Sequence, residues 1–374
     1  MDTDDASAER WAWVALALVP EVGWNARRYH ELLAVGPPVE LFRASRRALA
    51  SKVGDELARA VIGFDARAAS ARQRAAAETS RARLITLDDA DYPAALKQAP
   101  LPPPFLFVRG TPVREDGLAV AIVGSRRPTP YGVKVAERLA GDLAARGVTV
   151  VSGFARGVDT AAHRGALAAG GRTLAVLGSG VDVVYPPENR PLVTNVAGAG
   201  AVVSQFPMET PPLAAHFPIR NRVIAGLTLG TVVVEAAEKS GALITARFAG
   251  ELGREVYAVP GNVSSLVSEG TNRLIQDGAK LVRAWEDVVA EWPAIWRQAL
   301  RPVPPVGGDP CGAAAGLRSA TESRLLPLLG DEPVAIDHVI AKTGLPAGEV
   351  AASLMAMELR GLVRQLPGQR YVKA

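Results

Sequence analysis

The sequence has little of the chemistry that disulfides and transition-metal sites require. Among 374 residues there are one cysteine, Cys311, and four histidines scattered along the chain. A single cysteine excludes an intramolecular disulfide and predicts a cytoplasmic location, because disulfides persist mainly in oxidising compartments. Scattered histidines without neighbouring cysteines do not predict a metal site.

Long apolar runs are also missing. Asp2, Asp4 and Asp5 precede the first apolar run, so no signal peptide is expected. The run from Trp11 to Pro20 is too short to span a bilayer, and we expect no membrane segment.

The phosphate-binding sequences of common nucleotide enzymes are absent as well. There is no Walker A sequence, and Gly178-Ser179-Gly180 is not followed by the third glycine of a dinucleotide fingerprint. These absences argue against ATP and nicotinamide, and we expect no cofactor. The formal net charge of +4 is small and does not by itself identify a nucleic-acid-binding protein.

Residues 1–75 are expected to form a small helical domain. Trp11–Val19 and Arg27–Val35 are apolar-periodic and flank the turn Pro20–Gly23. This spacing is similar to a helix–hairpin–helix or SAM-like element, in which a glycine-rich turn meets a DNA phosphate. Glu21 stands where such turns usually have their first glycine and would repel a phosphate, so a packing domain is favoured over a DNA contact.

Residues 76–295 are expected to form an α/β domain. Apolar strands and amphipathic helices alternate over 118–290 at the spacing of βα units, which predicts a doubly wound, Rossmann-like parallel sheet. The predicted strands are Ala119–Val123, Thr149–Val151, Thr173–Leu177, Ala201–Ser204, Thr231–Glu235 and Glu255–Val259. Before them, residues 76–117 are expected to be a connector, in which Arg83–Leu87 can form a strand and Phe105–Val108 is an apolar run. The predicted helices are Tyr131–Arg146, Asp159–Ala169, Asn189–Ala197, Pro218–Leu227 and Ala242–Gly253.

The rest of the chain predicts a linker and a second small domain. Residues 296–317 are rich in proline and glycine and are expected to be the linker. Residues 318–374 predict three helices followed by a hairpin, which describes a winged helix. The helices are Thr321–Leu329, Ala335–Lys342 and Pro346–Arg360, and the hairpin strands are Leu362–Leu366 and Tyr371–Lys373.

The turns that follow the predicted strands share glycine, serine and arginine. Ligands of an open parallel sheet bind beyond the carboxyl ends of its strands, so these turns are expected to meet at one edge. Backbone N–H groups, helix N-termini and arginine side chains there can hold phosphates, although glycine and serine also serve chain reversal alone. Several such turns in a row indicate a long phosphate-bearing ligand. The predicted binding residues are Gly124, Ser125, Arg126, Gly153, Arg156, Arg190, Arg220, Asn221, Arg222, Ser240, Gly241 and Thr245.

Few aromatic residues accompany these turns. Phe154, Tyr185 and Phe217 are the candidates for stacking on bases. Stacking is therefore expected to be secondary to phosphate contacts.

Two acidic positions allow both a catalytic and a structural interpretation. Asp159 and His163 are four residues apart on one predicted helix and can form an acid–base dyad or support the helix. Helix support is favoured because no nucleophile stands at a fixed spacing from them. Glu235 ends a predicted strand, with Glu238 after it, and can be a catalytic carboxylate or a helix cap. We expect no enzymatic activity.

Long ordered motifs over about residues 105–290 closely resemble the DprA/Smf family of bacterial DNA-processing proteins. They include AIVGSRRPTPYG, VVSGFARGVDTAAH, FPIRNRVIAGL and GTNRLIQDGAKLV. The resemblance implies an extended Rossmann domain that binds and protects single-stranded DNA, dimerises, and loads the RecA recombinase during natural transformation. It also implies that Gly124, Ser125 and Arg126 correspond to the family's Gly-Ser-Arg DNA-binding motif. The terminal regions match the family's SAM-like and winged-helix domains more loosely.

The chain departs from the family pattern at two places. It has Ser204-Gln205 where the family often has Ser-Glu, and Pro187 where some relatives carry lysine. If that lysine contacts DNA in those relatives, Arg190 is the residue that can replace it here. Arg156, Arg220 and Arg222 match other basic positions of the family.

Other functions and the oligomeric state are open at this level. A related fold serves nucleotide phosphoribohydrolases, but their Pro-Gly-Gly-x-Gly-Thr loop is replaced here by Glu235–Gly241, which counts against that enzyme. A winged-helix transcription factor is a third interpretation. For the expected homodimer, the apolar stretch Ala242–Leu252 is a candidate surface.

Overall fold

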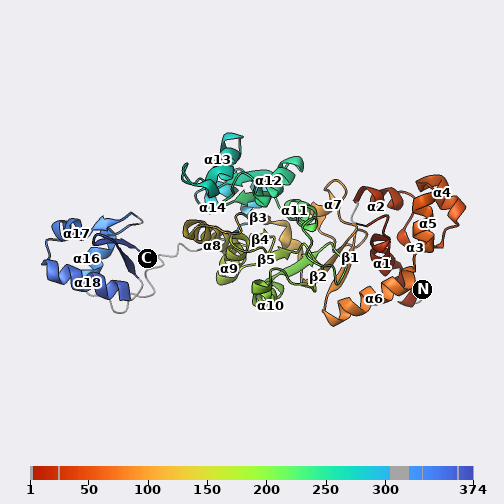
Figure 1. Cartoon of the computed structure of the whole chain (residues 1–374), viewed down its shortest axis with the longest axis horizontal. Coiled ribbons are helices and arrows are strands. Elements are labelled where there is room, and N and C mark those ends of the chain that lie inside the picture. Colours follow the sequence, from red (N-terminus) through yellow and green to blue (C-terminus); the bar gives the residue numbers. More distant parts are fainter. Residues whose placement is uncertain (1–2, 24–25, 304–319, 331, 360–361, 374) are drawn as a thin grey trace. The chain divides into compact units, whose positions relative to one another are not determined.

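The computed structural model of the chain describes residues 3–23, 26–303, 320–330, 332–359 and 362–373. These residues fall into two compact units, divided in the sequence between Pro302 and Val303. The first unit holds a large mixed sheet with surrounding helices, and the second is a small helical unit with its own three-stranded sheet (Figure 1). Most of the predicted linker 296–317, including Cys311, lies outside the described residues.

The first unit is built on a nine-stranded sheet of order β1-β2-β6-β5-β4-β3-β7-β8-β9, as far as the residues are described. From β6 to β9 in this order, neighbouring strands run parallel. Strands β1 and β2 extend the β6 edge in antiparallel fashion. The strands are β1 (Arg83–Thr86), β2 (Phe105–Gly110), β3 (Ala119–Val123), β4 (Thr149–Ser152), β5 (Thr173–Val176), β6 (Ala201–Ser204), β7 (Gly230–Val233), β8 (Glu255–Ala258) and β9 (Lys280–Leu281).

Helices cover both faces of this sheet. The α-helices that follow β1 are α7 (Ala94–Lys97), α8 (Pro130–Ala145), α9 (Val158–Ala168), α10 (Arg190–Ala199), α11 (His216–Gly226), α12 (Gly241–Glu251), α13 (Glu269–Gln276), α14 (Trp285–Val289) and α15 (Ala294–Gln298). Short 3₁₀ turns are η1 (Arg114–Gly117), η2 (Pro187–Asn189) and η3 (Leu266–Ser268). Helices α8, α9 and α10 pack on one face, and α7, α11 and α12 pack on the other (Figure 1).

Strand β3 shows why these strands appear as continuous apolar runs in the sequence. Val120 and Ile122 belong to the core beneath α8 and α9, whereas Ala121 and Val123 belong to the core beneath α11 and α12. Successive side chains of a strand point to opposite faces, and here both faces are buried. The doubly wound α/β fold is therefore confirmed, and the strands and helices predicted over 118–290 agree with the observed ones to within two residues at each end. The two-residue strand β9 was too short to be predicted.

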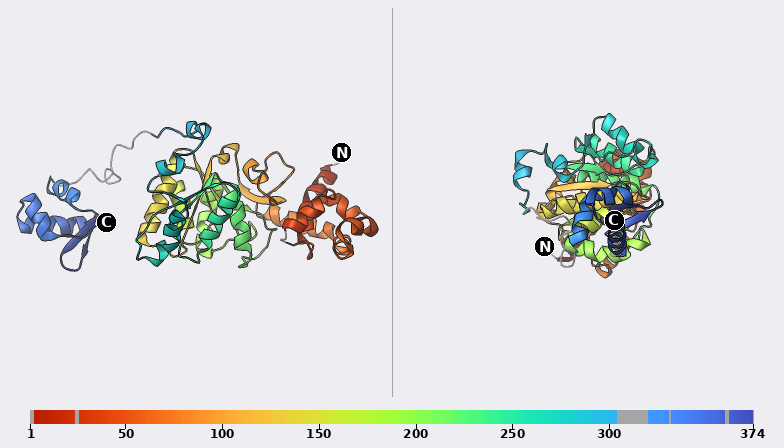
Figure 2. Two further views of the ribbon diagram at one scale, coloured as in Figure 1. Left: turned by 90° about the horizontal axis from the view of Figure 1, so that it is seen from above. Right: turned by 90° about the vertical axis from the view of Figure 1, so that its left-hand side faces the viewer.

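The N-terminal helices gather at one end of the first unit, beside β1 and β2 (Figure 2). They are α1 (Thr3–Leu18), α2 (Ala26–Leu33), α3 (Pro38–Arg43), α4 (Arg46–Val53), α5 (Asp55–Gly63) and α6 (Ala66–Thr79). Trp11 packs its ring 6.0 Å from that of Phe107, and Gln73 accepts a hydrogen bond of 2.8 Å from the Met208 amide. Helix α6 runs across residue 75, where the sequence places a domain boundary.

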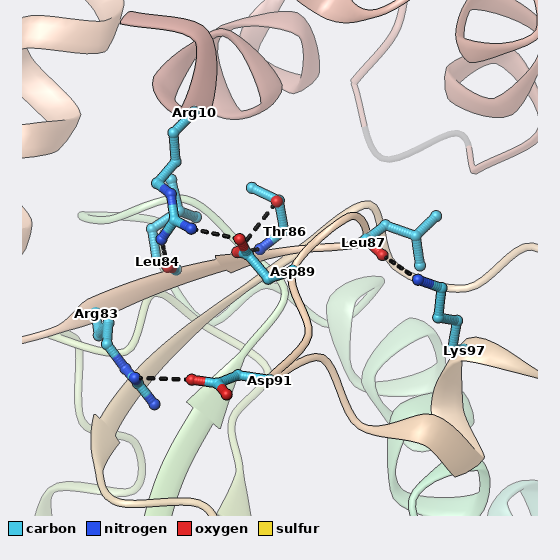
Figure 3. A network of polar contacts seen from close by, with 8 residues as sticks. All are labelled: Arg10, Arg83, Leu84, Thr86, Leu87, Asp89, Asp91 and Lys97. Carbon is cyan, nitrogen blue, oxygen red and sulfur yellow. Dashed lines mark hydrogen bonds and ion pairs between the residues drawn. The ribbon is translucent and has the colours of Figure 1, made fainter. Parts of the chain in front are cut away.

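Polar contacts also join these helices to the sheet edge. Arg10 of α1 donates to the carbonyl oxygen of Leu84 at 3.0 Å and pairs with Asp89 (Figure 3). Asp89 in turn accepts a 2.7 Å hydrogen bond from the amide of Thr86. A second pair, Arg83 and Asp91, lies on the same strand and loop at 3.1 Å (Figure 3).

In the turn after α1, two amides are used within the turn itself. The amides of Val22 and Gly23 both donate to the carbonyl oxygen of Val19, at 2.9 Å each. The carbonyl of Glu21 accepts from Arg28 at 2.6 Å. These contacts are those of a turn packed on itself.

The second unit has the elements of a winged helix. Its helices enclose a core that includes Leu325, Val339 and Leu354. The sheet order is β10-β12-β11, with both pairs antiparallel. The elements are α16 (Ala320–Leu325), η5 (Leu326–Leu328), β10 (Val334–Ala335), α17 (Ile336–Thr343), α18 (Ala347–Leu359), β11 (Val363–Leu366) and β12 (Arg370–Lys373).

Candidate nucleic-acid interface

A cleft of about 770 Å³ opens beyond the carboxyl ends of β3 and β7. These two strands are neighbours in the sheet, although the chain visits β4, β5 and β6 between them. The helix after β3 packs on one face of the sheet and the helix after β7 on the other. The connections thus diverge at this point, which is where open α/β sheets bind their ligands.

The cleft brings together most of the predicted binding residues. Those that line it are Gly124, Ser125, Arg126, Arg220, Asn221, Ser240, Gly241 and Thr245. Gly153 and Arg156 line a smaller adjoining pocket that shares Arg126 with the cleft. Lys239, an exposed residue before Ser240, also lines the cleft and was missed. It stands three residues before the predicted helix start at Ala242, and a basic residue there has no distinctive local pattern.

Arg126 is an exposed cation of the cleft. Its side chain is exposed and makes no hydrogen bond or ion pair with any described residue. Its guanidinium lies 5.3 Å from the centre of the Phe217 ring, which packs 5.9 Å from the Tyr185 ring. A planar cation beside two aromatic rings can contact a phosphate while a base stacks next to it.

Arg220 has a different position from the one the sequence suggests. It is 4% exposed, and its Nη1 donates to the carbonyl oxygens of Gly153 and Val176. Its Nε donates to Oδ1 of Asn221 at 3.0 Å. Burial lowers the pKa of Arg220 to about 10, and this is opposed by the nearby Asp159 carboxylate. Arg220 therefore stabilises the floor of the cleft and is not a free arm for a phosphate.

Asp159 lies in the first turn of α9. It is 6% exposed, and its Oδ2 accepts a 3.2 Å hydrogen bond from the amide of Ala155. Desolvation raises the pKa of Asp159, and the Coulombic attraction of Arg220 opposes that shift. A carboxylate in the first turn occupies the positive end of the helix dipole, so this terminus is already neutralised within the protein.

Asp159 and His163 do not form an acid–base dyad. The Nδ1 atom of His163 lies 2.7 Å from Oγ1 of Thr173, and Thr173 Oγ1 donates to the carbonyl oxygen of Val150. This arrangement requires the proton of His163 to be on Nδ1. Burial lowers the pKa of His163 to about 3, so the ring is neutral near pH 7. Each residue has a structural partner of its own, Ala155 for Asp159 and Thr173 for His163, so the two do not support the helix as a pair.

Glu235 closes the N-terminal end of α8. Its Oε2 accepts from the amide of Thr129 at 2.8 Å, and its Oε1 accepts from Thr129 Oγ1 at 2.6 Å. A side chain at Gly132 would place its Cβ 2.5 Å from the Glu235 carboxylate, so the helix approaches closely because glycine stands there. Glu235 is 3% exposed and does not line the cleft. It is a helix cap, and the catalytic interpretation is not supported.

Helices α11 and α12 both begin beside the cleft. Neither has an acidic residue in its first turn. At α12, Ser240 Oγ accepts from the Ala242 amide at 3.3 Å, and Gly241 and Thr245 line the cleft beyond it. At α11, the capping residue Ala215 has no side-chain acceptor. With exposed Arg126 and Lys239 close by, this side of the cleft is suited to anions.

Several predicted contacts lie outside the cleft. Arg156 forms a 2.6 Å ion pair with Glu188, and Arg190 is exposed at the start of α10 without lining either pocket. Arg222 points to the outer face of α11, where its guanidinium lies 5.3 Å from the Phe248 ring centre. Phe154 is fully buried, so it cannot stack on a base, and that prediction is wrong.

The described residues offer neither a metal site nor a membrane span. They contain no group of three or more His, Cys, Asp or Glu side chains placed to hold a metal ion. No helix among them has both the length and the apolar character needed to cross a bilayer.

Comparison with known families identifies two matching regions. Residues 83–293 match the model of DNA recombination-mediator protein A, and residues 310–369 match the DprA winged helix domain. A curated relative, protein Smf of Synechocystis, is 36% identical over 316 residues, which cover 77% of this chain and 79% of the relative. The putative DNA processing protein DprA of Mycobacterium tuberculosis is 35% identical over 381 residues, covering 98% and 94%.

Two solved structures share the fold. DprA of Streptococcus pneumoniae superposes with a TM-score of 0.66 at 34% identity, covering 76% of this chain and 98% of the other. DprA of Helicobacter pylori, whose structure is described as showing a unique single-stranded DNA binding mode, gives a TM-score of 0.50 at 30% identity. That match covers 56% of this chain and 94% of the other.

Proposed function

Because the chain belongs to the family of DNA recombination-mediator protein A, we propose that its strand-end cleft binds single-stranded DNA. The observation that carries this proposal is the convergence of two helix N-termini that lack first-turn acids with two unpaired cations. The N-termini are those of α11 and α12, and the cations are Arg126 and Lys239. A single strand can bend so that successive phosphates reach these positions, whereas a stiff duplex cannot.

Bases of the same strand have the paired rings of Tyr185 and Phe217 as a stacking surface. Aromatic stacking tolerates every base, so binding is expected to depend little on sequence. Phosphate contacts make the affinity fall with salt, with a log–log slope of about −0.7 for each neutralised phosphate.

We further propose that the protein protects incoming single strands and loads the RecA recombinase onto them during natural transformation. The description of the matching family as recombination mediators supports this role. It is tested by the assembly of purified RecA on single strands coated with single-strand-binding protein. The wild-type protein is expected to accelerate assembly, and Arg126→Ala to lose that effect.

We also propose a homodimer formed through the α/β domain, because two clefts that bind the same DNA strand bind it with higher overall affinity than one. In the candidate stretch Ala242–Leu252, Ala242, Ala246 and Ala249 are buried inside the protein itself, so only the outer side of α12 can contribute to that surface. Light scattering at micromolar concentration tests the dimer, and a monomer there would contradict it.

The protein is proposed to act without catalysis. The rival function is that of a nucleotide phosphoribohydrolase, which needs a carboxylate exposed to its substrate. Both carboxylate oxygens of Glu235 instead accept hydrogen bonds from Thr129. Release of a free base from a nucleoside monophosphate, abolished by Glu235→Gln, would favour the enzyme.

The deciding experiment is a titration of oligo-dT, a duplex and nucleoside monophosphates with the purified protein. Arg126→Ala is expected to weaken oligo-dT binding by about 1.5–3 kcal/mol, the range for hydrogen bonds to charged groups, and to flatten the salt slope. Arg127→Ala is the matched control, since Arg127 is an exposed neighbour that does not line the cleft. Equal binding by Arg126→Ala and wild type, or tighter binding of duplex than of single strand, would overturn the assignment.

A further inference from the structure

A second aromatic ring flanked by two arginines lies on the outer side of α11 and α12. The guanidinium of Arg222, on α11, is 5.3 Å from the centre of the Phe248 ring. That of Arg247, on α12, is 5.5 Å from the same ring. Both arginines are exposed and the ring is half-buried. We call these three residues the Phe248 cluster.

The Phe248 cluster continues two walls of the cleft. Ile244 lines the cleft, and Phe248 follows it by four residues on α12, which places the ring on the same helix face one turn further along. On α11, Pro218 lines the cleft and Arg222 follows it by four residues. Helices α11 and α12 pack against each other, so both steps lead along the same pair of helices (Figure 1). One helical turn is about 5.4 Å.

The cluster has the same composition as the aromatic part of the cleft. There, Phe217 has the guanidinium groups of Arg126 at 5.3 Å and Arg220 at 5.7 Å from its ring centre. The difference lies in availability, because Arg220 is buried whereas Arg222 makes no hydrogen bond or ion pair with any described residue. Arg247 has an exposed ion pair with Glu251 at 3.5 Å, which is weak in water.

We propose that the Phe248 cluster is a second subsite for the single strand that leaves the cleft, with a base on the aromatic ring and phosphates on the arginines. The subsite rests on the proposed function, because it continues the path of a strand held in the cleft. A half-buried ring edged by two exposed cations suits an unpaired base joined to phosphates. A duplex would have to unstack to use it.

The location predicts a dependence on oligonucleotide length. An oligo-dT just long enough to fill the cleft does not reach the Phe248 cluster, whereas a longer one does. Stacking of one base contributes about 1–3 kcal/mol, which is about 5- to 150-fold in affinity. Substitutions in the cluster are therefore expected to lower the affinity for long oligonucleotides by a factor in that range. The affinity for short ones should fall by less than about twofold.

The experiment measures the dissociation constants of a series of oligo-dT lengths for wild type, Phe248→Leu, Phe248→Trp and the double variant Arg222→Gln, Arg247→Gln. Phe248→Leu keeps an apolar side chain without a ring, and Phe248→Trp is expected to restore binding of long oligonucleotides. The control is Arg164→Gln, which removes one exposed charge from α9 on the opposite face of the sheet. If Phe248→Leu fails to fold, the double variant of the exposed arginines still tests the subsite.

A second readout locates the base directly. An oligonucleotide with 5-iododeoxyuridine at successive positions is expected to crosslink to the α12 peptide containing Phe248 at one position, and to the peptide containing Phe217 at an earlier one. Crosslinks at Phe217 alone would overturn the subsite.

The outcomes separate the inference from the function on which it rests. If wild-type protein binds no oligo-dT, the proposed function fails. If wild type binds but the cluster variants lose nothing at any length, the arginines only cover Phe248 and the inference fails. Equal losses for duplex and single strand would mean an unspecific phosphate contact and would also overturn it.

Discussion

The two sides of the strand-end cleft come from the same local pattern and have opposite properties. On one side, helices α8 and α9 begin after glycine- and serine-containing turns, and their N-termini are closed by the buried carboxylates of Glu235 and Asp159. On the other side, α11 and α12 have no acid in their first turns. A helix N-terminus is an anion site only where the protein has not already supplied the anion. The comparison assigns α8 and α9 to stability and α11 and α12 to binding.

The largest effect, a loss of stability, is expected from removing the buried carboxylate of Glu235 at the start of α8. Glu235→Ala removes two charge-assisted hydrogen bonds and leaves the half-buried Thr129 donors without an acceptor, which lowers the free energy of unfolding by about 3 kcal/mol. Urea denaturation measures it. Glu238→Ala is the control, because Glu238 is exposed and is expected to change stability by less than about 0.5 kcal/mol. Unchanged stability together with lost DNA binding would place Glu235 in the binding site instead.

The closed side also carries a pH dependence through His163. Its pKa is about 3 when folded and near 6.5 in the unfolded chain, so below pH 6.5 the unfolded state binds the extra proton. Stability due to this group is therefore lost as the pH falls from about 6.5 towards 3, by about 1.4 kcal/mol per pH unit. His163→Gln should remove that slope.

The measurement compares wild type and His163→Gln by urea denaturation between pH 7 and pH 4.5. The raised pKa of Asp159 makes stability rise as the pH falls, which is the opposite of the His163 effect. Asp159 is present in both proteins, so its contribution cancels in the difference between them. Equal pH dependence of the two proteins would contradict the neutral, buried state of His163.

A single substitution that adds an acidic side chain at the start of α12 should give this helix the same N-terminal charge arrangement as α8 and α9. Gly241→Asp places a carboxylate at the start of α12, and no atom lies within 4 Å of the added Cβ. It is expected to weaken oligo-dT binding about tenfold, or about 1.4 kcal/mol, because the anion competes with phosphate. Stability should be unchanged or rise by about 0.3–1 kcal/mol, since acids favour helix N-termini. Gly241→Asn controls for size, and equal binding by both variants would contradict the argument.

The smallest effect is expected from removing the winged-helix unit. If the open side of the cleft and its continuation hold the strand, deletion of residues 307–374 should leave the affinity for single strands within about threefold, under about 0.7 kcal/mol. The exposed positions of α18 include Ala351, Ala352 and Met355 and have no cation among them, which is consistent with this. A much larger loss would show that the unit itself binds DNA.

Single positions show how far the sequence could predict the site. Arg220 and Arg222 look alike in the motif FPIRNR, yet the first is 4% exposed and the second is open to solvent. Residues two apart on a helix point to nearly opposite sides, so only one of them can face the sheet. The motif predicts a basic helix start but not which arginine is buried.

Two aromatic residues likewise show that the local sequence does not predict which side chain is buried. Phe154 and Phe217 both precede predicted helix starts. Phe154, however, packs against His163 beneath the cleft, with ring centres 5.5 Å apart. Phe217 lines the cleft. Lys239 was missed because a basic residue before a serine has no distinctive local pattern. Burial depends on what packs above a residue, and no local window of sequence contains that information.

The sequence by itself determined the order and type of the elements, because apolar periodicity and turn residues act over a few neighbouring positions. It also determined that arginine-bearing turns collect at the carboxyl ends of parallel strands. Only the tertiary structure decided which turns remain open to a ligand. Glu235 reaches Thr129 across 106 residues of chain because β3 and β7 are adjacent in the sheet. That adjacency, which no local pattern encodes, closes one side of the cleft and leaves the other free for phosphates.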